Sequence, residues 1–145
     1  ALVPNDTSFS SQHGLGDLSS NPASINVRPT WDTYTGSGVK VAVVDTGYTG
    51  HADLVANIVG GYDFISNATR ANDGNGRDGS ALDPGDWVST GECGSGKPAL
   101  SSSWHGTHTS GIVAAVTNNG AGVAGVAFGA KVVPVRVLGK CGGYT

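Results

Sequence analysis

Short apolar runs along the chain predict three strands. A β-branched, apolar run over 39–45 is typical of a central strand in a parallel sheet, because strands that are covered on both faces are apolar throughout. Two further strands are expected over 58–64 and 131–138. Pro134 lies in the last of these and indicates an edge-like or irregular start of the strand, since proline has no backbone N–H to donate.

Two segments carry helical signals. Residues 27–34 follow Asn26, a residue type that caps helices, and they stop near Gly36, so a short helix is expected there. Residues 107–118 place apolar side chains toward one side and end at an Asn-Asn-Gly sequence, which predicts a second helix. The alternation of strand, helix and strand favours an α/β fold, with a parallel sheet, flanking helices and right-handed crossovers.

Two other segments lack a regular period. Residues 1–24 are rich in Ser, Asn, Asp and Pro, and we expect them to form an arm laid over the surface of a domain. Residues 66–103 are too long for an ordinary connection, so we expect a functional or ion-organised loop. A length of 145 residues suits a single domain over 1–145 or part of one, and 24 glycines indicate many tight turns.

The charge of the chain argues against two classes of partner. The formal net charge is −3 with only 8 Lys and Arg residues, so we expect no nucleic acid and no anionic membrane surface as a partner. No apolar run reaches the roughly 18 residues that a membrane span needs. The composition is that of a mildly acidic protein, 38% hydrophobic and 13% charged.

The two cysteines favour a disulfide over free thiols. Cys93 and Cys141 lie far apart in glycine-rich segments and lack the CxxC spacing of many metal sites. A bond between them would close a loop of roughly 50 residues, worth about 4 kcal/mol in the chain-entropy model. It would also point to an oxidising compartment. The absence of methionine suits a mature protein cut from a precursor, and it equally suits loss of an initiator Met.

Acidic residues mark two candidate sites. Asp45 ends the first apolar strand, and in open α/β sheets ligands bind at the carboxyl ends of the strands; a turn cap is the other interpretation. Residues 73–78 and 83–86 place carboxylate and amide oxygens on glycine-rich turns, which suits Ca²⁺. Their spacing is not that of an EF-hand, and a solvated acidic loop is the alternative.

His105 lies where a loop passes into the second predicted helix, and three interpretations are open for it. It could be a general base oriented by a carboxylate such as Asp45. With His108, three residues later on the same helix face, it could bind zinc, although no third ligand is placed convincingly. It could also be an ordinary surface histidine.

Four segments together resemble the signatures of the subtilisin-like serine peptidases (subtilases), especially secreted bacterial members with a long insert before the histidine. In the order of the family they are 41–47, 51–54, 105–111 and 122–127. The resemblance implies a three-layer, subtilisin-like fold of which this chain supplies the N-terminal part. It implies that Asp45 and His105 are the triad aspartate and histidine, and the order Asp before His agrees with that of subtilisin.

The resemblance also implies binding sites. Asp53 would ligate a structural calcium beside the arm, with Gln12 or Asp6 as a partner from the arm. Further acids fall where relatives often have a second calcium loop: Asp63, Asp73, Asp78, Asp83 and Asp86. The segment after 131–138 would pair with an extended peptide substrate, as an added strand, at Gly139, Gly142 and Gly143.

One departure from the family pattern limits the implied chemistry. The nucleophilic serine and the oxyanion asparagine of the family come well after the histidine, and Ser110 lies in a segment whose family role is packing. We therefore expect a secreted, extracellular endopeptidase in which this chain works with a C-terminal portion of the same peptidase. That portion would be a second polypeptide after a nick, or the continuation of a truncated sequence. A catalytically inactive binding or inhibitory module and a zinc hydrolase using His105 and His108 are the alternatives.

Overall fold

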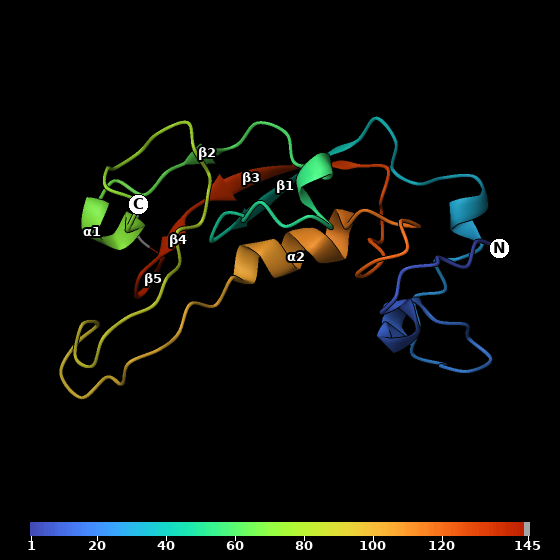
Figure 1. Cartoon of the computed structure of the whole chain (residues 1–145), viewed down its shortest axis with the longest axis horizontal. Helices are drawn as coiled ribbons and strands as arrows, with labels where there is room; N and C mark the ends of the chain where they lie inside the picture. Colours follow the sequence, from blue (N-terminus) through green and yellow to red (C-terminus); the bar gives the residue numbers. More distant parts are fainter. Residues whose placement is uncertain (144–145) are drawn as a thin grey trace. The chain divides into compact units, whose positions relative to one another are not determined.

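A parallel sheet carries the site-bearing segments. The computed structural model describes residues 1–143, and its elements are labelled in Figure 1. Strands β1 (Lys40–Asp45), β2 (Tyr62–Asp63) and β3 (Lys131–Arg136) form one sheet in the order β1-β3-β2. β2 and β3 run parallel, with Tyr62 opposite Val135. The predicted α/β fold with a parallel sheet and helices is confirmed.

Of the two expectations for the strand around Pro134, the edge-like one is wrong, because β3 is the middle strand of the sheet in residues 1–143. The carbonyl of Arg136 accepts a hydrogen bond from Phe64 N at 2.9 Å, so the backbone of Arg136, and of Pro134 two residues earlier, faces β2. At that level the neighbour is Gly61, which precedes β2. The missing N–H of proline therefore falls in an interruption of the ladder, between the isolated bridge of Ile58 with Val132 and the pairing of Tyr62 with Val135.

β1 is an edge strand within residues 1–143, whereas its sequence predicts a central one. Its burial alternates, and Val44 is 61% exposed beside the buried Asp45. An apolar, β-branched run favours extended backbone on a pleated surface, but it does not set how many neighbours the strand has.

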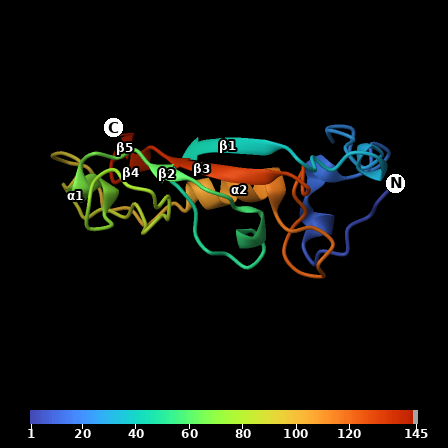
Figure 2. The same ribbon diagram turned by 90° about the horizontal axis from the view of Figure 1, so that it is seen from above.

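Helix α2 (His105–Ala114) carries the histidine signature and is shorter than the predicted 107–118. It ends early because the N–H of Val116 donates to the carbonyl of Asp53 at 2.6 Å, outside the helical ladder. Figure 2 shows the start of α2 close to the end of β1. No helix in residues 1–143 has the length and apolar character needed to cross a membrane.

The other predicted helix, over 27–34, is wrong. Only a short 3-10 helix, η3 (Thr30–Asp32), forms there, and Asn26 has a φ of 53°, whereas a helix N-cap has extended backbone. A helix that the sequence did not predict, α1 (Ala68–Ala71), lies inside the long loop. The side chain of Asn67 caps it by accepting a hydrogen bond from Arg70 N.

The chain divides into two compact units. The first contains Ala1–Val41, His51–Ile58 and Ser110–Val132, and the second contains Ala42–Gly50, Val59–Thr109 and the residues from Val133 onward. β1, β3 and α2 each continue from one unit into the other. The predictions for Asp45, His105 and the long loop all fall in the second unit.

The N-terminal arm belongs to the core of the first unit, so it is more than a surface covering. It forms two 3-10 helices, η1 (Phe9–Ser11) and η2 (His13–Leu15). Leu15 is buried together with Trp31 and Ala124, and the indole N–H of Trp31 donates to Val126 O at 2.8 Å. A further 3-10 helix of this unit, η4 (Val55–Asn57), follows the Asp53 segment.

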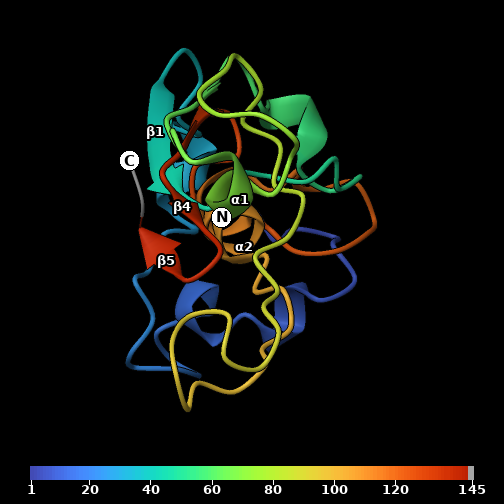
Figure 3. The ribbon, with the colours of Figure 1, turned by 90° about the vertical axis from the view of Figure 1, so that its left-hand side faces the viewer.

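In the second unit, a hairpin follows β3. β4 (Leu138–Gly139) pairs antiparallel with β5 (Gly142–Gly143). α1 packs against β4, and Figure 3 shows the two side by side. A Cβ on Gly139 would lie 2.2 Å from the carbonyl oxygen of Arg70, so only glycine fits at this contact.

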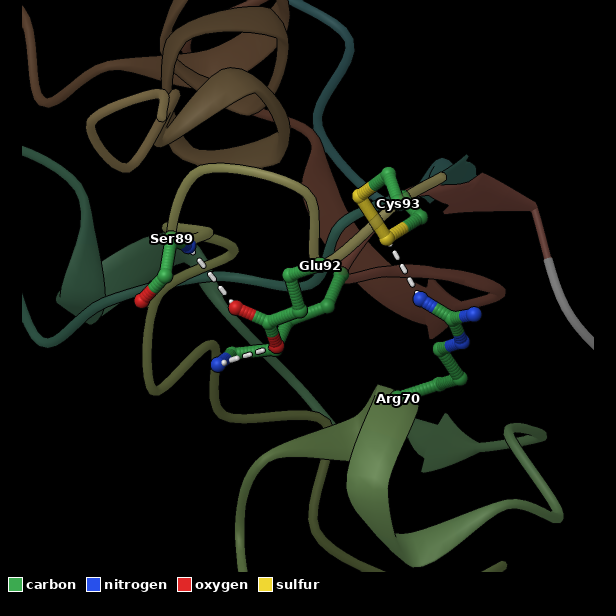
Figure 4. The surroundings of a disulfide bond; sticks show 6 residues. Arg70, Ser89, Glu92 and Cys93 are labelled. Carbon is green, nitrogen blue, oxygen red and sulfur yellow. Dashed lines mark hydrogen bonds and ion pairs between the residues drawn. A yellow bond between two sulfur atoms is a disulfide. The ribbon is translucent and has the colours of Figure 1, made fainter. Parts of the chain in front are cut away.

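A disulfide ties the long loop to this hairpin. Cys93 and Cys141 are bonded, and their Cα atoms lie 5.5 Å apart (Figure 4). Beside the bond, Ser89 N donates to one carboxylate oxygen of Glu92 at 2.8 Å, and the ammonium of Lys140 contacts the other at 2.9 Å. These contacts lower the pKa of Glu92, the Ser89 N–H first and Lys140 second.

Replacing Gly61 by alanine is expected to lower the free energy of unfolding of the complete protein by about 3 kcal/mol. The new Cβ would lie 2.7 Å from Pro134 Cγ and 2.8 Å from Pro134 O, at a φ of 112°. Gly60→Ala is the control, because its φ is 59° and its Cβ would meet no atom within 4 Å. There we expect a loss of about 1 kcal/mol. Equal losses in urea unfolding would contradict this account.

The lowered pKa of Glu92 predicts a pH-dependent contribution to stability. Ionised Glu92 stabilises the folded state above its ordinary pKa of 4.5, and this stabilisation is lost as the pH falls through the lowered value. Glu92→Gln should therefore lower Tm at neutral pH, and the difference from wild type should vanish in acid. Lys97→Gln changes a charge in the same loop and serves as the control. A difference for Glu92→Gln that persists unchanged at low pH would refute the prediction.

Candidate active site

Asp45 and His105 are 60 positions apart and are joined in the second unit. Nδ1 of His105 lies 2.9 Å from Oδ1 and 2.8 Å from Oδ2 of Asp45. The imidazole is 62% exposed, whereas the Asp45 side chain is only 10% exposed. The carboxylate accepts the Nδ1 proton, which leaves Nε2 as the ring nitrogen that can take a proton from another group.

The carboxylate of Asp45 is held by two further donors. The N–H of Thr46 donates to Oδ1 at 2.7 Å, and the hydroxyl of Thr109 contacts Oδ2 at 3.2 Å. These contacts fix the orientation of the carboxylate toward His105. An oriented carboxylate behind a solvent-accessible imidazole is suited to general-base catalysis.

The turn after Asp45 fixes where α2 begins. Thr46 Oγ1 accepts a hydrogen bond from Gly106 N at 2.8 Å, directly after His105. A Cβ on Gly106 would lie 2.1 Å from the carbonyl oxygen of Gly47, so the two backbones can approach this closely only with glycine at 106. Upstream, Trp104 has a φ of 51°, an uncommon conformation for a bulky residue, immediately before the histidine.

The two other polar residues considered on α2 do not join this pair. His108 is exposed on the helix, and Ser110 is fully buried, with a hydroxyl that lacks a hydrogen-bond partner in the described residues. No group of three or more His, Cys, Asp or Glu side chains in residues 1–143 could hold a metal ion. The predicted zinc pair of His105 and His108 therefore lacks a third ligand of these types.

Sequence analysis missed Arg136, which is completely buried close to the site. Its guanidinium pairs with Asp63, which is also completely buried, and contacts Asp73 at 3.2 Å. Burial raises the pKa of Asp63, against the opposing effects of the Ile65 N–H and of Arg136. A signal was present in the sequence, because a charged residue occupies a position in step with the buried Val132 and Pro134 of an apolar strand.

In the first unit, Asp53 and Asp6 both bind the loop that follows α2. Asp53 accepts hydrogen bonds from Asn119 Nδ2 at 2.8 Å and Val123 N at 2.9 Å. Asp6 Oδ2 accepts one from Asn118 N at 2.8 Å, while its buried Oδ1 has no partner within the described chain. Two buried carboxylates with an unpartnered oxygen fit a hard cation such as Ca²⁺.

Gln12 is the other arm residue expected to ligate calcium, and its side chain instead pairs with the backbone of Ala124. Its amide nitrogen donates to Ala124 O at 2.9 Å, and its amide oxygen accepts from Ala124 N at 2.7 Å. Both ends of the side chain are therefore used in pairing the arm with a backbone segment. Of these two arm residues, Asp6 is the one with a carboxylate oxygen that has no hydrogen-bond partner in the described chain.

The predicted second calcium loop has its acids largely engaged in other contacts. Asp63 is the clearest case, because its carboxylate is paired with the Arg136 guanidinium. Asp86 accepts hydrogen bonds from Ser103 N and Oγ. Three acids line a cavity of about 470 Å³, and each accepts a hydrogen bond from a nearby N–H: Asp73, Asp78 and Asp83.

Two of these acids have shifted pKa values. Hydrogen bonds from Ser80 N–H and Asn75 lower the pKa of Asp78. Burial raises the pKa of Asp83, against the hydrogen bond from Gly85 N–H, and Asp83 Oδ2 is buried without a partner in residues 1–143. These three side chains do not converge as a group that could hold a metal ion. A calcium site in this loop stays a prediction.

The glycines expected to bind substrate lie in and beside the β4–β5 hairpin. Gly139 pairs with Gly142 in the hairpin and is buried, so its lack of a side chain serves packing against α1. Gly142 is exposed, with a φ of 99°, and a Cβ added there would meet no atom within 4 Å. Gly143 pairs with Leu138. Substrate pairing at these residues stays a prediction.

Comparison with known proteins identifies relatives along almost the whole chain. An extracellular protease of Xanthomonas campestris pv. campestris is 66% identical over 142 residues, which are 98% of this chain and 24% of that protein. An extracellular basic protease of Dichelobacter nodosus is 52% identical over 149 residues, again 98% of this chain and 24% of that protein. The chain thus spans about a quarter of the length of these curated relatives.

Solved structures and a family model agree with these relatives. A protease from Pseudoalteromonas arctica superposes with a TM-score of 0.92 at 62% identity, over 98% of this chain and 41% of that one. The model of the subtilase family matches residues 36–145, a range that includes Asp45 and His105. The chain therefore belongs to the subtilase family.

Proposed function

We propose that this chain supplies the aspartate and the histidine of an Asp-His-Ser triad in a secreted serine endopeptidase. Family membership and the extracellular proteases among its relatives support this function. The observation that carries it is the contact of both Asp45 carboxylate oxygens with His105 Nδ1, at 2.9 and 2.8 Å, on an imidazole that is 62% exposed.

In this mechanism, His105 is the base and then the acid. Its Nε2 takes the proton of a serine hydroxyl as the serine attacks the peptide carbonyl, and it later gives this proton to the leaving amine. Asp45 holds the Nδ1 proton and stabilises the imidazolium that forms. The serine and the asparagine of the oxyanion hole would come from a C-terminal portion of the same peptidase, which is the proposed partner.

Protein or peptide substrates would bind as an added strand. An extended peptide can pair its backbone with a strand edge, and its side chains then face specificity pockets. The exposed Gly142 offers such a backbone without a side chain in the way. The buried Gly139 would contribute only by shaping the hairpin.

Calcium would act as a structural ion in the first unit. Asp6 and Asp53 are the residues that would hold it, because both are buried against the same loop and Asp6 has an unpartnered oxygen. The ion would supply a positive charge that ties the arm to the loop over 118–123. No part of the acyl-transfer chemistry requires it.

Labelling with a serine-directed fluorophosphonate tests the peptidase function. In the complete peptidase, we expect covalent label outside residues 1–145 together with hydrolysis of a peptide substrate. Asp45→Asn should reduce kcat about 10⁴-fold, because the imidazole loses the carboxylate that sets its tautomer. Folded protein that takes no label and cleaves no peptide would indicate an inactive binding module instead. Activity abolished by a chelator while folding is intact would point to a zinc hydrolase.

Calcium titration of thermal stability tests the proposed ion site. Calcium at 100 times its Kd should stabilise the complete protein by about 2.7 kcal/mol, and EDTA should reverse this effect. Asp6→Ala and Asp53→Ala should each abolish or sharply reduce the calcium-dependent increase in Tm.

Gln12→Ala is the matched control for the arm. It should lower Tm by removing the amide contacts with Ala124, but the increase on adding calcium should remain. Loss of the calcium response in Gln12→Ala alone would reassign the ligand from Asp6 to Gln12.

A further inference from the structure

Arg136 is a cation with no exposed surface in the strand that runs beside the site. Its partner Asp63 is equally buried. Taking both charges out of water costs free energy that their attraction does not reliably repay, so a buried ion pair is weak evidence for a role in stability. The contacts of Arg136 indicate what else it does.

On one side, the guanidinium is fixed to a single segment. Nη1 pairs with Asp63 and contacts Asp73 Oδ2 at 3.2 Å, while Nη2 donates to the carbonyl of Ala71. A planar guanidinium can satisfy these acceptors at once, whereas an ammonium is a single point charge without this fork. The head group of Arg136 is therefore held from the 63–73 segment.

On the other side, β3 holds the end of β1. Nε of Arg136 donates to the carbonyl of Thr46 at 3.2 Å. The next backbone N–H, that of Val137, donates to the carbonyl of Asp45 at 2.9 Å. Two consecutive residues of one segment thus fix the two consecutive carbonyls at the point where Asp45 presents its side chain.

The turn is also packed too closely to move independently. A Cβ on Gly47 would lie 3.0 Å from Arg136 Cδ and 2.3 Å from Ala81 O. Thr46 in turn accepts the hydrogen bond from Gly106 N, next to His105. A shift of the Arg136 side chain would therefore be passed to both Asp45 and the first turn of α2.

From these contacts we infer that Arg136 is a positioning residue for the Asp45–His105 pair. It holds the carbonyl of Thr46 so that the Asp45 carboxylate faces His105 Nδ1. This inference rests on the proposed peptidase function. Arg136 acts through the turn at Thr46 and does not act on the reacting atoms.

The test compares variants of the complete peptidase, with kcat expressed per fluorophosphonate-labelled site. The main variant is Arg136→Met combined with Asp63→Asn, because removing the arginine alone would leave Asp63 buried and unpaired. The asparagine also retains an oxygen to accept the Ile65 N–H. We expect kcat per site to fall about 10- to 100-fold with KM unchanged.

The pH profile separates positioning from simple folding. A misplaced Asp45 stabilises the imidazolium less, so the acid limb of kcat/KM should move to lower pH in the double variant. If Arg136 had a purely structural role, the double variant would have a lower Tm and a smaller fraction of labelled protein. Its kcat per site and the acid limb of its kcat/KM profile would stay at wild-type values. That result would overturn the inference.

Two further variants complete the experiment. Lys131→Met removes a cation at the other end of β3, which bonds Ala56 O at 3.0 Å, and should keep the wild-type kcat per site. Arg136→Lys keeps the charge beside Asp63 and should give an intermediate kcat. If the double variant does not fold, a wild-type kcat and acid limb in Arg136→Lys refute the inference. A wild-type enzyme without label or hydrolysis would instead refute the proposed function.

Discussion

The hydrogen-bonded pair of Asp45 and His105 depends on a close approach of two backbones. The end of β1 and the start of α2 meet through Thr46 Oγ1 and Gly106 N at 2.8 Å, and a side chain at 106 would collide with the carbonyl of Gly47. The geometry of this pair is therefore a consequence of backbone packing. The positions of β1 and α2 orient the carboxylate and the imidazole, and the hydrogen bonds between the two side chains complete the arrangement.

The buried charges of Arg136 and Asp63 in the second unit also hold the turn that follows Asp45. Arg136 and Asp63 are both completely buried, and they occupy space that apolar side chains could fill at less cost in desolvation. In exchange, one guanidinium reaches the 63–73 segment and the turn at Thr46 together. A polar contact of this kind defines one arrangement of the loops, whereas apolar packing tolerates several.

The acidic residues divide by their surroundings. Asp6 and Asp53 are buried against one loop of the first unit, and an oxygen of Asp6 is left without a partner in the described chain. In the long loop, Asp73 and Asp78 accept hydrogen bonds from backbone N–H groups two residues ahead, as turn-forming aspartates do. Composition alone could not separate these roles, because it counts the acidic residues without showing which groups surround each carboxylate.

The sequence by itself determined the α/β class and the segments of β1, β3 and α2, since these depend on local periodicity. Through the family signatures it also singled out Asp45 and His105. Only the tertiary structure decided that β3, which contains Pro134, lies between β1 and β2. It also decided the burial of the arm around Leu15 and the pairing of Asp63 with Arg136. These features depend on residues far apart in the chain, and local patterns do not specify which distant partner a residue meets.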